Sequence, residues 1–381
     1  MPLTHLENNK PLTIVADMNI ASLEAFFNDT TLLKDDNNPK AVNIITTAGR
    51  EITADFLAKT QPEILLIRSV TPINEELLTN NNSVRFVGSA TIGTDHVDQH
   101  YLAERNITFA NAAGSSKHSV AQYVLTAILT LRPEYWQKPL TLGIIGLGNI
   151  GSTLAQYATD LGWQVLGYDP LLPESNINNS SFDTVLSQSD VVSLHVPLTV
   201  DKSVDPIDGS NYPTRHLIDA AELAKMPNDT MLINTARGAV VSEAALSLDI
   251  ENTRRQVVLD VFEHEPTIDA DFLAKLAIAT PHIAGYSLEG KLRGTQMIYD
   301  ALCERMGIEP KQAMQQLLPE NCYLWSELKA HPDRLVKFYN ILQDDAALRA
   351  TVFDGRVAGA DFDKLRRDYR LRREWQSDMS I

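Results

Sequence analysis

Short apolar runs alternate with longer amphipathic stretches over about the first 300 residues. The runs are rich in Ile, Val, Leu and Phe, and helical patterns follow several of them. This alternation predicts βαβ units and two mostly parallel sheets. The strands expected in the first sheet are Leu12–Ala16, Asn43–Thr46, Ile64–Arg68, Arg85–Gly88 and Thr108–Ala110. Those expected in the second are Thr141–Gly146, Gln164–Asp169, Val191–Val196, Met231–Asn234, Gln256–Val261 and Ala277–Pro281.

Two long apolar patterns mark the borders of these arrays. Ser119–Leu131 is apolar nearly all round, as expected of a helix buried between domains, and Leu288–Met306 reads as a long helix. We therefore predict an α/β fold with two Rossmann-like or flavodoxin-like doubly wound domains and a C-terminal α+β region. The expected division is a substrate-binding domain over 1–118 with a return segment at 285–303, a nucleotide-binding domain over 119–284, and a C-terminal region over 304–381. Dense turn residues predict loops at Leu171–Asn179 and Asp201–Pro213.

Composition narrows the class of protein. The 381 residues are 44% hydrophobic and 22% charged, and a run of about 18 apolar residues is lacking, which argues against a membrane span. The first residues lack a secretory pattern, and two cysteines, Cys303 and Cys322, fit a reducing compartment, so we expect a cytoplasmic protein. The net charge of −16 disfavours nucleic acid as a partner.

A glycine-rich segment predicts the nucleotide site. Gly146, Gly148 and Gly151 close an apolar strand and open a helix, the context that this motif requires. The first glycine permits a tight turn, the second lets a pyrophosphate approach the helix N-terminus, and the third allows close packing of helix and strand. Asp169 ends the next strand, 23 residues after Gly146, where a carboxylate accepts hydrogen bonds from ribose and repels a 2′-phosphate. NAD is therefore favoured over NADP.

Three later strands are followed by groups suited to acid–base chemistry. Arg237, Glu265 and His282 each follow a different strand, and the carboxyl ends of parallel strands meet at one edge of a sheet. Taken singly, each has a structural reading as a turn, a solvated carboxylate or a strand cap. His96 and His100 are spaced as a ligand pair, but no third ligand follows in a recognised pattern, so we expect no metal.

These motifs together resemble the NAD-dependent D-2-hydroxyacid dehydrogenases over about residues 10–300. That family has an arginine before Gly, a glutamate before Pro and a histidine in Thr-Pro-His, which Arg237, Glu265 and His282 match. The resemblance implies that His282 is the general base, Glu265 supports the imidazolium, and Arg237 binds the substrate carboxylate. It also implies that Asp260 lies near the nicotinamide end. Further residues expected to contact the cofactor are Asn149, Ile150, Val196, Thr235, Ala236 and Gly285, with Val196 standing where the family has Thr.

Other segments resemble a narrower branch of that family, the erythronate-4-phosphate dehydrogenases. They include Gly88–Asp98, Thr280–Thr295 and the C-terminal Phe362–Trp375. The resemblance implies a homodimer formed through the C-terminal region. It also implies oxidation of the phosphorylated hydroxy acid 4-phospho-D-erythronate in vitamin B6 synthesis, with substrate bound by three residues, Ser69, Thr91 and Tyr286.

Two alternatives stay open at this stage. One is another D-2-hydroxyacid dehydrogenase of the 3-phosphoglycerate or glycerate type, and the other is an NAD-sensing scaffold on the same fold. The cations that meet a substrate phosphate are also open. Candidates are Arg68, Lys291, Arg293 and residues 363–374, which carry six Lys or Arg against three Asp or Glu. The pattern of this basic island is more typical of a solvated helix face or a subunit contact than of a phosphate site, which two subunits would then share.

Overall fold

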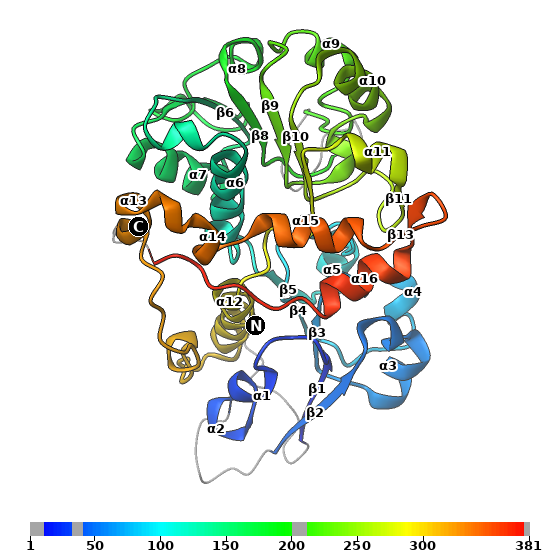
Figure 1. Cartoon of the computed structure of the whole chain (residues 1–381). Coiled ribbons are helices and arrows are strands. Elements are labelled where there is room, and N and C mark those ends of the chain that lie inside the picture. The colour runs from blue at the N-terminus through cyan, green and yellow to red at the C-terminus, as the bar shows by residue number, and fades with distance from the viewer. Residues whose placement is uncertain (1–10, 33–40, 200–211, 377–381) are drawn as a thin grey trace. The chain divides into compact units, whose positions relative to one another are not determined.

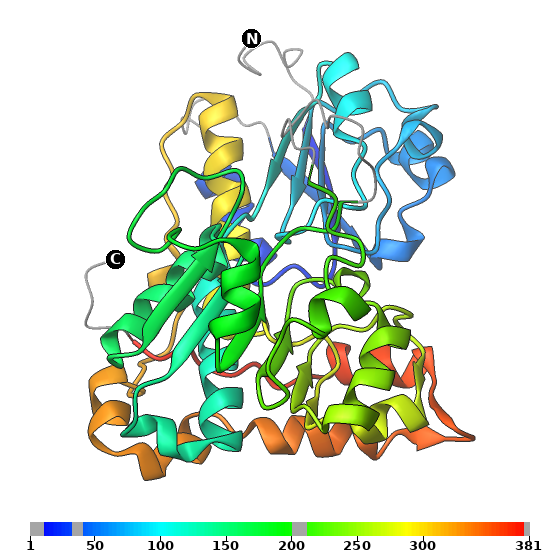
Figure 2. The same ribbon diagram turned by 90° about the horizontal axis from the view of Figure 1, so that it is seen from above.

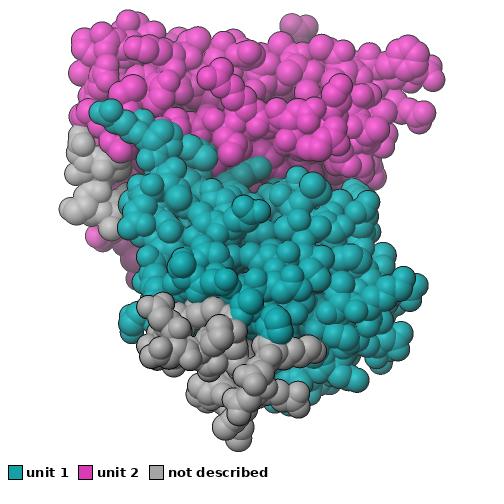
Figure 3. Space-filling view, turned by 90° about the horizontal axis from the view of Figure 1, so that it is seen from below, with its two compact units in different colours: residues 1–116, 288–320 teal, residues 117–287, 321–381 magenta. Residues whose placement is uncertain are grey.

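The chain folds into two compact units. The structure, a computed structural model, describes residues 11–32, 41–199 and 212–376. Unit 1 consists of residues 1–116 and 288–320, and unit 2 of residues 117–287 and 321–381 (Figure 3). The predicted boundaries at 118 and 284 lie close to the two points where the chain leaves and re-enters unit 1. The region predicted over 304–381 is divided, because 304–320 belongs to unit 1 and the remainder to unit 2.

Unit 1 is built on a five-stranded parallel sheet of order β2-β1-β3-β4-β5, whose strands run side by side in Figure 2. Its strands are β1 Leu12–Asp17, β2 Val42–Thr47, β3 Ile64–Ile67, β4 Phe86–Ser89 and β5 Thr108–Asn111. Its helices are α1 Leu23–Phe26, α2 Asp29–Leu32, α3 Ala54–Thr60, α4 Glu75–Leu78, α5 Gln99–Glu104 and α12 Leu288–Met306.

Both faces of this sheet are covered. Successive strand residues point to opposite faces, so Ile14 and Leu66 join one hydrophobic cluster while Val15 and Leu65 join another. All four side chains are fully buried. Burial on both faces explains why the strands read as continuous apolar runs.

Unit 2 contains a six-stranded parallel sheet of order β12-β10-β9-β8-β6-β7 (Figure 1). Its strands are β6 Thr141–Ile145, β7 Gln164–Tyr168, β8 Val191–Leu194, β9 Met231–Asn234, β10 Val257–Leu259 and β12 Ile278–Ala279. The eleven predicted strands are therefore all present, with small differences at their ends. Counted from its own first strand, each sheet begins 2-1-3-4-5, so the prediction of two doubly wound domains is confirmed.

The helices of unit 2 cover its sheet on both faces. They are α6 Lys117–Leu131, α7 Asn149–Asp160, α8 Phe182–Gln188, α9 Ala220–Leu223, α10 Glu243–Thr253 and α11 Ala270–Lys275. The helix predicted at Ser119–Leu131 is α6, and its residues from Ser119 to Leu129 are buried. It packs in one hydrophobic cluster with Leu154 of α7 and Ile144 of β6.

The C-terminal segment adds short helices and a small antiparallel sheet to unit 2. The helices are α13 Trp325–Ala330, α14 Leu335–Phe338, α15 Ile341–Arg349 and α16 Gly359–Arg367. Strands β13 Val352–Phe353 and β14 Arg356–Val357 join β11 Ile268–Asp269 in the order β11-β14-β13. The predicted loop at Asp201–Pro213 lies largely outside the described residues, and none of the described helices has the length and apolarity to span a membrane.

Candidate active site

The turn between β6 and α7 has the geometry that the glycine motif predicts. Gly146 adopts a φ of +90°, a conformation that L side chains rarely adopt, and a Cβ there would lie 2.7 Å from the carbonyl oxygen of His195. A Cβ on Gly151 would lie 2.0 Å from the carbonyl oxygen of Gly146. Both positions therefore require glycine for the strand and helix to pack this closely.

The same turn offers room and donors for a dinucleotide. Gly148 is the N-cap of α7, and a Cβ built there would meet no atom within 4 Å among the residues described. The Thr235 hydroxyl is buried and makes no hydrogen bond within the described part of the chain. Thr235 follows β9 of the same parallel sheet, so an open helix N-terminus and an unsatisfied hydroxyl both stand at its carboxyl edge, as a bound dinucleotide requires.

Asp169 ties the glycine turn to the neighbouring strand. Its Oδ2 accepts a hydrogen bond from the Leu147 amide at 2.9 Å, and its Oδ1 accepts one from the Leu171 amide at 3.0 Å. Each carboxylate oxygen can accept more than one hydrogen bond. The residue can therefore fix the turn and still accept from a ribose hydroxyl.

The predicted cofactor residues gather at one edge of the sheet. Each follows the carboxyl end of a strand, and neighbouring strands pair in parallel. The residues and the strands they follow are Asn149 and Ile150 after β6, Val196 after β8, Thr235 and Ala236 after β9, Asp260 after β10, and Gly285 after β12. This edge is where ligands bind in open α/β sheets.

His282 and Glu265 form a hydrogen-bonded pair at this edge. The distance from His282 Nδ1 to Glu265 Oε2 is 2.9 Å, and the other carboxylate oxygen of Glu265 accepts from the Phe262 amide at 2.8 Å. Nδ1 is thereby directed to the carboxylate, and in the described structure Nε2 makes no hydrogen bond. His282 has a φ of 56°, in the left-handed region that is uncommon for a residue with a side chain.

The surroundings keep Glu265 ionised. Burial alone would raise the pKa of Glu265, but the charge and hydrogen bond of His282, the Phe262 amide and the charge of Arg366 outweigh it and lower that pKa. An ionised carboxylate on Nδ1 stabilises a protonated imidazole. The pair can therefore accept a proton at Nε2.

Arg237 lies at the neighbouring strand end, directly after β9. Its carbonyl oxygen accepts from Asn234 Nδ2 at 2.9 Å, and its own Nη1 donates to the Ala236 carbonyl at 2.8 Å. The backbone around the guanidinium is thereby held in place. The sequence predicted that Arg237, Glu265 and His282 lie at one edge of the sheet, and in the structure they follow strands that end at that edge.

Asp260 organises the segment that carries His282. Its Oδ1 accepts from Thr280 Oγ1 at 2.6 Å and from the Ile283 amide at 2.8 Å, and its Oδ2 accepts from the Ala284 amide at 2.8 Å. Burial raises the pKa of Asp260 to about 6, although His282 and these hydrogen bonds favour the charged form. The contact with the nicotinamide end stays a prediction, whereas the structural clamp is directly visible.

Sequence reasoning missed the part that Arg372 plays. Its guanidinium donates to the carbonyl oxygens of Ile283, Ala284 and Tyr286, and lies 4.5 Å from the centroid of the Tyr339 ring. In the sequence, Arg372 is simply one of the basic residues of the segment 363–374. Only tertiary contacts reveal that it holds the backbone that follows His282.

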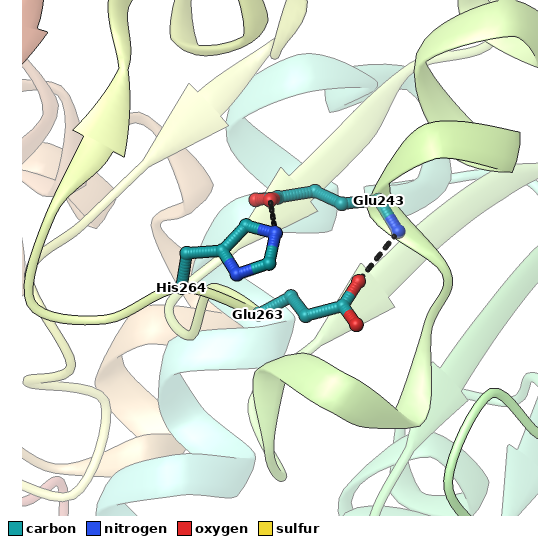
Figure 4. Close-up of side chains that lie close together, drawn as sticks. All are labelled: Glu243, Glu263 and His264. Carbon is teal, nitrogen blue, oxygen red and sulfur yellow. Dashed lines mark hydrogen bonds and ion pairs between the residues drawn. The ribbon is translucent and has the colours of Figure 1, made fainter.

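One further cluster lies on the loop that carries Glu265. Glu243, Glu263 and His264 bring three ligand atoms within 4.8 Å of one another (Figure 4). Glu263 already accepts from His216 Nε2 at 2.6 Å and from the Glu243 amide at 3.1 Å, and Arg215 lies 3.6 Å away. Protein donors thus balance the Glu263 carboxylate, and the network anchors the loop to the start of α10.

The substrate residues expected in unit 1 lie at adjacent strand ends. Ile67 of β3 pairs with Ser89 of β4, so Ser69 and Thr91 stand two residues past the same register position. Ser69 is exposed, and Thr91 Oγ1 lies 2.8 Å from the Ser89 hydroxyl. Tyr286, the third expected residue, lies in unit 2 and packs edge-on against Tyr369 with a centroid distance of 6.0 Å.

Comparisons with known proteins agree with this geometry. The D-isomer specific 2-hydroxyacid dehydrogenase, NAD binding domain, matches residues 133–284. The chain is 68% identical over 380 residues to the erythronate-4-phosphate dehydrogenase of Psychrobacter cryohalolentis, covering 97% of this chain and 98% of that protein. It is 47% identical over 369 residues to the enzyme of the same name from Acinetobacter baumannii, covering 96% and 98%.

A solved structure gives the same fold. D-lactate dehydrogenase from Aquifex aeolicus, complexed with NAD and lactic acid, aligns with a TM-score of 0.60 and 25% identity over 77% of this chain and 96% of that chain. The match to an NAD-binding domain confirms the predicted cofactor class. The chain belongs to the erythronate-4-phosphate dehydrogenase family, within the D-isomer specific 2-hydroxyacid dehydrogenases.

Proposed function

We propose that this protein oxidises 4-phospho-D-erythronate to (R)-3-hydroxy-2-oxo-4-phosphooxybutanoate with NAD⁺, a step in vitamin B6 synthesis. The observation that carries the chemistry is the 2.9 Å contact between His282 Nδ1 and Glu265 Oε2 at the edge of the sheet that bears the glycine turn. The choice of substrate rests on the name of relatives that are similar over nearly the whole chain.

His282 is the general base of this mechanism. Its Nε2 takes the proton of the C2 hydroxyl, and Glu265 stabilises the imidazolium that results. Arg237 holds the substrate carboxylate through paired hydrogen bonds and polarises the C2 oxygen. The glycine turn at the start of α7 would hold NAD⁺, which would supply the acceptor for the hydride of C2. Ser69, Thr91 and Tyr286 bind the remainder of the substrate.

NADH formation by the purified protein tests this proposal. Wild-type protein is assayed with 4-phosphoerythronate, with 3-phosphoglycerate and erythronate in parallel, and a 2-oxo acid is added in a companion assay with product analysis. Selective turnover of 4-phosphoerythronate supports the proposal. Preferred turnover of 3-phosphoglycerate would assign a different substrate, and NAD binding without turnover of any acid would favour a scaffold.

The same proposal includes a cytoplasmic homodimer assembled through the C-terminal region. Val352 and Phe353, the two residues of β13, are 38% and 82% exposed, and contact with a second copy would remove this apolar surface from water. Light scattering of the wild type and of Phe353→Ser measures the mass in solution. A monomeric wild type would contradict the dimer.

A further inference from the structure

Helix α16 delivers one residue of the basic island to the loop that carries Glu265. Phe362 on this helix is fully buried, and its ring lies edge-on to Phe262 with a centroid distance of 6.5 Å. At the start of the helix, a Cβ on Gly359 would lie 2.9 Å from the ring of Pro266. The helix therefore docks directly on the loop between Phe262 and Pro266.

Arg366 lies about one helical turn after Phe362. Its guanidinium carbon is 5.8 Å from the centroid of the Phe362 ring and 5.9 Å from that of the Tyr286 ring. Its positive charge also acts on the Glu265 carboxylate. Arg366 thus lies beside Tyr286, which the proposed function assigns to the substrate, on a helix that contacts both ends of the loop carrying Glu265.

The hydrogen-bond donors of Arg366 are largely unused. Its Nε is buried and lacks a hydrogen-bond partner within the described residues. Its nearest carboxylate, Asp363, is 4.0 Å from Nη1, beyond hydrogen-bond distance, and only 22% of the Arg366 side chain is exposed.

Other arginines of unit 2 with little exposure spend their donors on the protein itself. Arg255 donates to Asp249 and to the carbonyls of Pro227, Thr230 and Leu223. Arg349 donates to Asp345 and to two further carbonyls. A charged donor that is buried without a partner is costly, so Arg366 is poised for an acceptor that the protein alone does not provide.

We propose that Arg366 binds the phosphate group of the substrate and so determines specificity for a phosphorylated hydroxy acid. The inference rests on the proposed function. A guanidinium offers the planar pair of donors that phosphate oxygens accept, and it offsets the repulsion between a phosphate and the Glu265 carboxylate. In 4-phosphoerythronate the phosphate is carried on C4, two carbon atoms beyond C2, within the part of the substrate proposed to contact Ser69, Thr91 and Tyr286.

Steady-state kinetics of Arg366→Gln with 4-phosphoerythronate and with erythronate test the proposal. The ratio of the two kcat/KM values measures how strongly the enzyme prefers the phosphate. Loss of a charge-assisted hydrogen bond is expected to lower this ratio on the order of 10- to 100-fold. Arg366→Lys keeps the charge and loses the planar fork, so an intermediate ratio is expected.

Arg367→Gln is the matched control. Arg367 is the next residue of the same helix, its side chain is 63% exposed, and it pairs with Asp368 at 3.2 Å. Its removal changes the charge of the segment equally, and the ratio should stay within about twofold of wild type. If Arg366→Gln lowers kcat/KM for both substrates by the same factor, Arg366 acts only through Glu265 and the proposal is overturned.

Inorganic phosphate gives a readout that does not depend on turnover. In the presence of NADH, phosphate should raise the Tm of the wild type and of Arg367→Gln by the same amount. It should raise the Tm of Arg366→Lys less, and leave the Tm of Arg366→Gln unchanged. Equal stabilisation of wild type and Arg366→Gln would overturn the proposal even if the enzyme is active. If phosphate stabilises the protein only when Arg366 is present, but the enzyme does not oxidise 4-phosphoerythronate, the anion site is supported and the proposed function is contradicted.

Discussion

Two strand-to-helix turns follow the first strand of sheets that share the order 2-1-3-4-5, yet only one has the glycine geometry suited to a pyrophosphate. In unit 2, β6 passes through Gly146 and Gly148 into the 12-residue helix α7, and a Cβ at Gly148 would meet no described atom within 4 Å. In unit 1, β1 ends at Asp17 and leads to α1, a helix of four residues whose N-cap Ser22 has a φ of 51°. Topology alone therefore does not create the nucleotide site.

Charge separates the two turns further. Asp17 is almost fully buried, and its Oδ1 accepts from both the amide and the side-chain nitrogen of Asn19 at 2.9 Å. A carboxylate at this position repels phosphate, whereas the start of α7 presents amide donors and the positive end of a helix dipole. The residues in the turn after the first strand of each sheet therefore determine which sheet is suited to bind the dinucleotide.

The largest expected effect separates the catalytic role proposed for unit 2 from the substrate contacts proposed for unit 1. His282→Ala removes the proposed base and should lower kcat by about 10³-fold or more. Ser69→Ala removes one exposed hydroxyl of unit 1 and should lower kcat/KM by about 10-fold or less, since a neutral hydrogen bond contributes little. Both are measured by NADH formation from 4-phosphoerythronate.

NADH binding and thermal unfolding serve as controls for this pair. Both variants should bind NADH and unfold like wild type, because neither change touches the glycine turn. A His282→Ala enzyme with near-normal turnover would remove the proposed base and with it the division of roles between the units.

Gly148→Ala sharpens the comparison of the two turns. The added methyl group occupies the space predicted for the pyrophosphate, so the Kd for NADH should rise about 10- to 100-fold, while the free energy of unfolding falls by about 1 kcal/mol or less. Met18→Ala, at a 62% exposed position in the turn after β1, should leave NADH binding unchanged. Fluorescence titration with NADH measures both.

In Gly151→Ala, by contrast, the loss of stability is expected to exceed that in Gly148→Ala. Its methyl group would lie 2.0 Å from a backbone oxygen, so unfolding should become easier by about 1–3 kcal/mol. Equal losses of stability in Gly148→Ala and Gly151→Ala would mean that Gly148 serves packing rather than ligand approach.

The sequence predicts the sheets and the strand-end residues because both depend on local patterns. Apolar runs such as Ile64–Ile67 are buried on both faces, and Arg237, Glu265 and His282 lie within about six residues after the ends of their strands. The sequence marks residues 363–374 as candidates for phosphate binding, but it cannot single out Arg366 for the proposed phosphate contact or predict the contacts of Arg372. Each depends on how the C-terminal segment packs on loops far away in the chain, and their neighbours Arg367 and Arg370 are exposed.

A smaller effect is expected from Glu265→Gln, which keeps the shape of the side chain and removes its charge. Because the pKa of Glu265 is lowered, wild-type Glu265 is ionised throughout the neutral range and stabilises a protonated His282. The variant should lose about 10-fold or more in kcat, and the acidic limb of its pH–rate profile should move to lower pH. An unchanged pH profile would remove the role proposed for Glu265.

The smallest effect concerns the clamp that holds the His282 segment. Burial raises the pKa of Asp260 to about 6, above the value near 4 of an unfolded chain, so its contribution to stability is full below about pH 4 and is lost as pH rises through 6. Asp260→Asn cannot titrate. The free energy of unfolding of the variant, relative to wild type, should therefore increase by about 1–3 kcal/mol between pH 4 and pH 7. Urea unfolding at both pH values measures this difference, with the exposed Asp229→Asn as control. A difference that is constant with pH would show that Asp260 is ionised in the folded protein across this range, as its three hydrogen-bond donors favour.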